Sequence, residues 1–179
     1  MRGVLIGRFQ PFHSGHLEVV RRIRSDRPAA PLVLGVGSAE QSYTWENPFT
    51  AGERFEMIEA ALREASVDRV AILAVADIQR HALWVRYLEG LLPSFERVYT
   101  NNPLTRLLFE RAGYLVESPR LIQRSRFEGL RLRVRLADGL PLQDRVPPAV
   151  GRYLESIDAA SRLSLLRGPR GPLHSPAGP

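Results

Sequence analysis

The sequence predicts an α/β protein with a doubly wound parallel sheet and helices on both of its faces. Short apolar runs that are typical of buried strands alternate five times with segments whose apolar residues have helical spacing. The chain has 179 residues, of which 44% are hydrophobic, and both values suit a single domain with a substantial core. We expect one domain over residues 1–165 and a disordered tail over 166–179, which is rich in Gly and Pro.

The apolar runs predict five strands, because each is short and most end at a polar residue or glycine. In chain order, the expected strands cover residues 3–6, 32–36, 69–75, 97–100 and 114–116. The helical spacing of apolar side chains predicts helices near residues 15–24, 51–62, 82–92, 103–111, 129–136 and 147–160.

Two of these helices carry clear start signals. Thr50 and Glu53 form a capping box, in which the hydroxyl binds an amide of the first turn and the carboxylate binds the amide of Thr50. Asn102 followed by Pro103 predicts a helix that starts with an asparagine cap and a proline in its first position. These signals place helix starts after the second and fourth strands.

Composition excludes several kinds of chemistry. The chain has no cysteine, so disulfides, thiolate nucleophiles and cysteine-bound metals are absent. All 25 basic residues are arginine, which excludes a Schiff-base lysine and the lysine of a P-loop. The net charge of +6 fits an anionic ligand. The longest apolar run, Val70 to Ala76, is too short to span a bilayer, so we expect a cytoplasmic protein without membrane contact.

The most informative segment is the loop after the first strand, Gly7-Arg-Phe-Gln-Pro-Phe-His-Ser-Gly-His16. It lies where an α/β sheet binds phosphate, and it places His13 and His16 on one side of the first helical turn. Gly15 leaves the backbone open to close approach. We expect the two imidazoles and the free amides to hold phosphate, rather than the histidines only capping the helix or filling space.

This loop resembles the signature of the nucleotidylyltransferase superfamily, and more narrowly that of the archaeal-type nicotinamide mononucleotide adenylyltransferases. The similarity covers roughly residues 1–160. It continues through Gly37-Ser-Ala39, Asn47-Pro-Phe-Thr-Ala-Gly-Glu-Arg54, Asp77-Ile78, Ala82-Leu-Trp-Val85 and Asn102-Pro-Leu104. The resemblance implies a Rossmann-like fold, a homo-oligomer and the joining of nicotinamide mononucleotide and ATP to give NAD and pyrophosphate. It also implies Mg²⁺ bound mainly through the ATP phosphates, with no metal ligand from the protein.

The resemblance also implies roles for individual residues. His16, His13 and Arg8 would act in catalysis, with His16 stabilising charge on the α-phosphate. ATP would be bound by Gly7, Phe9, Gln10, His13, Gly15, His16, Asn102, Arg126, Gly129 and Arg133. Nicotinamide mononucleotide would be bound by Ser38, Asp77, His81 and Trp84, with Trp84 stacking on the cationic pyridine. The alternatives are a core tryptophan, an Asp77 that ends its strand and an Asn102 that is chiefly a helix cap.

The second ATP-binding block departs from the family pattern of aromatic-Ser-Gly-Thr followed two residues later by Arg. Here Glu128 replaces the serine and Leu130 replaces the threonine, while Gly129 and Arg133 match. Glu46 also stands where relatives carry Arg, and His81 where they carry Asn. Arg124, Arg126, Arg131 and Arg135 lie nearby and either compensate or form a solvated face.

Two alternatives to the adenylyltransferase therefore stay open. One is a nucleotidylyltransferase that acts on another small phosphate or phosphonate, against which Trp84 and Asp77 argue. The other is a non-catalytic nucleotide-binding protein that kept only the first phosphate cradle, which Glu128, Leu130 and Glu46 favour. Nucleic acid is not an expected partner, because aromatic residues are few and no nucleic-acid-binding pattern is present.

Overall fold

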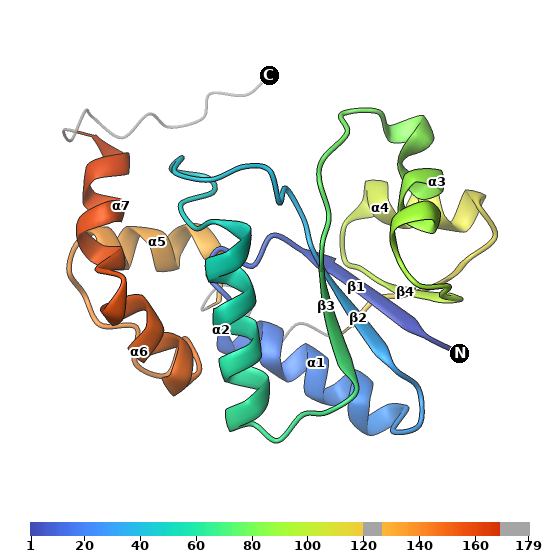
Figure 1. Cartoon of the computed structure of the whole chain (residues 1–179), viewed down its shortest axis with the longest axis horizontal. Coiled ribbons are helices and arrows are strands. Elements are labelled where there is room, and N and C mark those ends of the chain that lie inside the picture. Colours follow the sequence, from blue (N-terminus) through green and yellow to red (C-terminus); the bar gives the residue numbers. More distant parts are fainter. Residues whose placement is uncertain (120–126, 169–179) are drawn as a thin grey trace.

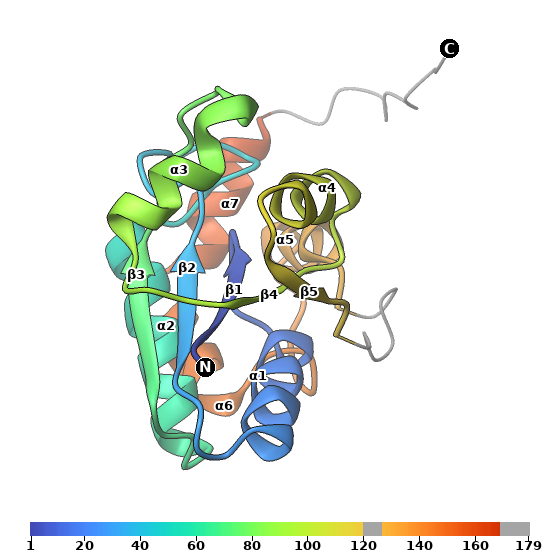
Figure 2. The same ribbon diagram turned by 90° about the vertical axis from the view of Figure 1, so that its right-hand side faces the viewer.

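The computed structural model describes residues 1–119 and 127–168, which form a five-stranded parallel sheet and seven helices. The strand order is β3-β2-β1-β4-β5, as Figure 2 shows from left to right. The strands are β1 (Gly3–Gly7), β2 (Leu32–Val36), β3 (Val70–Ala74), β4 (Arg97–Tyr99) and β5 (Leu115–Glu117). This order confirms the predicted doubly wound sheet.

Helices cover both faces of the sheet (Figure 1). On one face lie α1 (Ser14–Asp26) and α2 (Ala51–Glu64), with α5 (Gly129–Ala137), α6 (Pro148–Ser156) and α7 (Ala159–Arg167) packed outside them. On the other face lie α3 (His81–Leu91) and α4 (Pro103–Arg111). No helix among the described residues is long and apolar enough to cross a membrane.

The alternation of side chains along the central strands divides the core into two layers. Val4 pairs with Val33 and Val98 in neighbouring strands, and all three point towards α3 and α4. Leu5, the next residue, pairs with Leu34 and points towards α1 and α2. Both layers consist of buried apolar side chains, which explains why these strands are continuous apolar runs in the sequence.

The structure confirms both predicted helix caps. Thr50 Oγ1 accepts a hydrogen bond from Glu53 N (3.1 Å), and a carboxylate oxygen of Glu53 accepts one from Thr50 N (2.9 Å). Asn102 Oδ1 accepts one from Thr105 N (3.0 Å) at the start of α4. The capping patterns therefore placed these helix starts correctly.

The C-terminal part differs from the prediction in two ways. The single helix expected over 147–160 is two helices, because Asp158 adopts a left-handed backbone (φ 47°) and caps α7 with its own side chain. Helix α7 runs to Arg167, so the first two residues of the expected tail are helical. Residues 169–179 lie outside the described part of the chain.

The topology also fixes where a ligand can bind. Strand order reverses between β1 and β4, since the chain moves outward from β1 in both directions. In open α/β sheets the crevice at this reversal, beyond the carboxyl ends of the strands, is the usual ligand site.

Candidate active site

A cavity of about 370 Å³ lies at the carboxyl ends of four strands. It is lined by Gly7 and Arg8 after β1, by Ser38 after β2, by Asp77 after β3 and by Asn102 after β4. His81 and Trp84 of α3 close it on one side. The structure thus brings together seven of the residues that the sequence predicts for the site.

The walls of this cavity combine an aromatic surface with polar groups. Trp84 is half-buried and meets the edge of Phe109 with ring centroids 5.6 Å apart, so it lines the cavity and also packs on the core. Asp77 Oδ1 accepts a hydrogen bond from Gln79 N (3.0 Å). Arg8 is exposed and has no ion-pair partner among the described residues. Its guanidinium is therefore available to an anionic ligand.

The two histidines of the first loop cap α1 together. His13 Nδ1 accepts a hydrogen bond from His16 N (3.2 Å), and His16 Nδ1 accepts one from His13 N (3.3 Å). Because both Nδ1 atoms are acceptors, each neutral ring carries its proton on Nε2. No described protein group takes the Nε2 hydrogen of either ring. The capping interpretation of the sequence is thus correct for one edge of each ring, and the other edge remains a donor.

A column of aromatic rings holds this pair in place. The rings of His13 and His16 are stacked with centroids 3.4 Å apart, and Phe127 and Phe12 stack on their outer faces at 5.9 and 5.5 Å. Phe9 meets His16 edge-on at 4.9 Å. Burial lowers the pKa of His13 to about 4. Burial, together with the neighbouring His13, lowers the pKa of His16 well below its usual value. Both imidazoles are therefore neutral donors at pH 7.

This burial makes stability depend on pH. The unfolded chain binds a proton at His13 near pH 6.5, whereas the folded chain does so only near pH 4. Stability should therefore be complete above pH 6.5 and fall as the pH drops towards 4, with a loss of about 2 kcal/mol from His13 by pH 5. Urea unfolding of the wild type and His13→Asn, which keeps a capping oxygen but does not titrate, measures this. Equal pH slopes would contradict the assignment.

The start of α5 lies beside this column. Arg133 is buried, and its Nη1 donates to the carbonyl of Gln10 (3.1 Å), while its Nε has no hydrogen-bond partner among the described residues. Burial and the neighbouring Arg8 lower the pKa of Arg133, whereas Glu46 opposes this shift. Glu128, at the N-cap of α5, makes no capping hydrogen bond and instead pairs with Arg131 (3.1 Å). Arg124 and Arg126 lie outside the described residues.

Comparison with known proteins decides the family. The profile of the family described as cytidylyltransferase-like matches residues 4–136, which include every residue predicted for the site. The chain belongs to the cytidylyltransferase-like family. Curated proteins named nicotinamide-nucleotide adenylyltransferase from Picrophilus torridus and Thermoplasma acidophilum are 43% and 42% identical to it. The matches cover 91% and 92% of this chain and 95% and 91% of the relatives.

A solved structure shares the fold. It is a bifunctional NMN adenylyltransferase/ADP ribose pyrophosphatase from Francisella tularensis, complexed with AMP and a manganese ion. Its TM-score is 0.78 at 21% sequence identity over 92% of this chain. The present chain spans about half (51%) of that longer protein.

Two of the residues that the sequence predicts to bind ATP, Phe9 and Gln10, have buried side chains. Gln10 is buried, and its amide exchanges two hydrogen bonds of 3.0 Å with the backbone of Phe49, so its side chain is not free to bind ATP. Phe9 is buried in the aromatic column, where its ring fills the space that a Cβ at Gly7 would need. The side chains of Phe9 and Gln10 therefore stabilise the conformation of the first loop through buried contacts.

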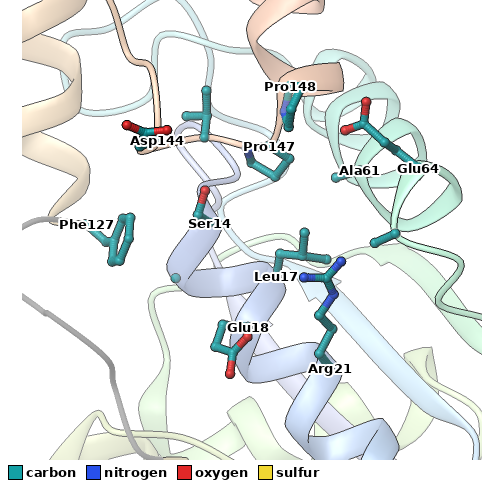
Figure 3. A pocket seen from close by; sticks show the side chains of 13 residues that line it. Ser14, Leu17, Glu18, Arg21, Ala61, Glu64, Phe127, Asp144, Pro147 and Pro148 are labelled. Carbon is teal, nitrogen blue, oxygen red and sulfur yellow. The ribbon is translucent and has the colours of Figure 1, made fainter.

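Gly15 lies on a different surface. It lines a second cavity of about 620 Å³ on the outer side of α1, shown in Figure 3. Glu18, Glu64, Asp144 and Arg21 are among the residues that line it. A Cβ at Gly15 would lie 3.1 Å from Cβ of Phe127, so a larger residue here would require Phe127 to shift by a few tenths of an ångström.

Thr100 and Arg54 are among the residues at or near the site that sequence reasoning missed. Thr100 lines the cavity directly after β4, and its position at the reversal of strand order was a usable signal. Arg54 belongs to a motif that was noted, yet nothing in the sequence shows that its side chain reaches the loops after β1 and β2.

Proposed function

We infer that this protein is a nicotinamide-nucleotide adenylyltransferase, which joins nicotinamide mononucleotide and ATP to give NAD and pyrophosphate. The observation that carries this function is the pair of neutral imidazoles at the start of α1, in the loop whose Arg8 lines a cavity that also contains Asp77 and Trp84. Relatives of that name match over nearly the full length of both chains. A cytoplasmic location and a homo-oligomer stay predictions.

The reaction needs no protein nucleophile. A phosphate oxygen of the mononucleotide attacks the α-phosphorus of ATP, a new P–O bond forms, and the bond to the β-phosphate breaks to release pyrophosphate. The protein must align the two substrates and stabilise negative charge on the α-phosphate and the leaving group. The Nε2–H groups of His13 and His16 supply neutral donors, and the guanidinium groups of Arg8 and Arg133 supply positive charge.

A divalent cation, proposed to be Mg²⁺, would neutralise phosphate charge when it is bound with ATP. Among the described residues, no group of three or more His, Asp or Glu side chains could hold a metal ion. We propose that the ATP phosphates rather than protein side chains hold this cation.

Incubation of the purified protein with ATP, Mg²⁺ and nicotinamide mononucleotide tests the proposal, with NAD and pyrophosphate as the expected products. The acid form of the mononucleotide is assayed in parallel, because the two forms differ only in the pyridine substituent. Formation of pyrophosphate with another small phosphate alone would favour the second nucleotidylyltransferase hypothesis. Nucleotide binding without any turnover would favour the non-catalytic one.

Trp84 should contribute mainly to binding of the mononucleotide. Stacking of a pyridinium on indole contributes about 0.5–2 kcal/mol, so Trp84→Ala should raise the KM for nicotinamide mononucleotide about 2- to 30-fold and change that for ATP much less. Trp84→Phe keeps a smaller ring against Phe109, so its KM for nicotinamide mononucleotide should lie between those of the wild type and Trp84→Ala. Equal changes in both KM values, with a large loss of stability, would show that Trp84 is only a core residue.

A further inference from the structure

Arg54 is a fully buried arginine in the first turn of α2 (0% exposed). Its hydrogen-bond partners among the described residues are all main-chain carbonyls. Nε donates to Thr50 O (3.1 Å), Nη1 donates to Arg8 O (3.1 Å) and Gly37 O (2.7 Å), and Nη2 donates to Ser38 O (3.2 Å). One side chain thus joins the start of α2 to the loops that follow β1 and β2.

These two loops form a wall of the cavity at the carboxyl ends of the strands. Arg8, Gly37 and Ser38 all line that cavity. Each loop also contains a non-glycine residue with a left-handed backbone, Phe9 (φ 52°) and Ser38 (φ 48°). Such conformations cost free energy and persist only where the surroundings fix them. The loop carbonyls that Arg54 binds belong to Ser38 itself, to Gly37 before it and to Arg8, which precedes Phe9.

Charge gives a second reason why Arg54 acts on the loops. Among the described residues, no carboxylate lies within ion-pair distance of its guanidinium. Burial lowers its pKa to about 10, while Glu40 and Glu53 raise it and Arg8 lowers it, so it stays charged at neutral pH. A buried cation needs hydrogen-bond partners, and here only the loop and helix carbonyls supply them. The positive charge therefore keeps these carbonyls oriented towards the guanidinium of Arg54.

We propose that Arg54 is a positioning residue for the mononucleotide site, which sets the loops so that Arg8 and Ser38 face the cavity. The proposal rests on the adenylyl transfer inferred above. It does not require Arg54 to touch either substrate. Because small misplacements of binding groups cost much of the rate, loosening these loops should impair turnover in a protein that is still folded.

Arg54→Lys is the test variant, because it keeps the charge but cannot reach four carbonyls from one planar group. Met57→Ala is the matched control, since Met57 is also fully buried on α2 and packs only in the apolar core. Kinetics are measured at a temperature at which circular dichroism shows both variants to be folded. Arg54→Lys should lower kcat/KM for nicotinamide mononucleotide about 10- to 100-fold, whereas folded Met57→Ala should retain the wild-type value.

Wild-type kcat/KM in folded Arg54→Lys, or an equal loss in Met57→Ala, would overturn the proposal. If Arg54→Lys is unfolded in buffer, sucrose, which strengthens effective burial, is added to both variants and the wild type. A variant that remains unfolded even there would also overturn it, because Arg54 would then serve folding as a whole.

Failure of the proposed function is distinguishable from failure of this inference. If the wild type forms no NAD, the adenylyl transfer is wrong. The positioning role is then measured by quenching of tryptophan fluorescence on addition of nicotinamide mononucleotide. Weaker quenching in Arg54→Lys than in Met57→Ala supports the role, and equal quenching overturns it.

Discussion

Replacement of His16 with alanine should lower kcat about 100- to 1000-fold, which is the usual effect of removing one preorganised donor from a developing charge. The Nδ1 atom of His16 accepts a hydrogen bond from His13 N, so the ring presents Nε2–H in a fixed orientation. Burial keeps this donor neutral at pH 7. Steady-state kinetics with saturating substrates measure the effect, and an unchanged kcat would contradict a role in the transition state.

The same substitution should also affect folding. His16 is half-buried, stacks on His13 and completes the capping box of α1, so its loss should cost about 1 kcal/mol of stability. Two further variants separate the roles of the ring edges. His16→Asn keeps an acceptor near Nδ1 and should preserve stability but not kcat. His16→Gln places a donor near Nε2 and should recover more of the rate than of the stability.

The parts of the fold that were predictable from sequence depend on local patterns. Strand runs, helical spacing and the caps at Thr50 and Asn102 involve neighbours a few residues apart, and the structure confirms them. The position of the site followed from topology, because parallel strands bring their carboxyl ends to one edge. The helix break at Asp158 was missed because a left-handed backbone at a non-glycine residue has no strong sequence signal.

The roles that were missed depend on long-range contacts. Gln10 meets Phe49 across 39 residues, and Arg54 meets Arg8 across 46. A polar residue in a nucleotide-binding loop looks like a ligand contact until its partners are known. The Gln10 side chain is buried and its amide already bonds to the backbone of Phe49, so it is not available to bind substrate.

Substitutions at the start of α5 should have the second large effect, on catalysis with ATP. Glu128→Ser together with Leu130→Thr should raise kcat/KM for ATP about tenfold or more. Hydroxyl donors would replace a carboxylate and an apolar side chain at a helix N-terminus that attracts phosphate. Each new hydrogen bond to a charged phosphate contributes about 1.5–3 kcal/mol before losses in geometry. The wild type should bind ATP weakly and with strong dependence on salt, because guanidinium groups carry most of the contact.

Two control variants separate the sources of this gain. Glu128→Gln removes the repulsive charge but adds no hydroxyl, and Leu130→Thr adds one hydroxyl and leaves the charge. Ser at position 128 would also cap α5, which has no side-chain cap now, so thermal unfolding must be measured beside the kinetics. A rise in stability without any change in ATP affinity or rate would show that this segment does not touch the triphosphate.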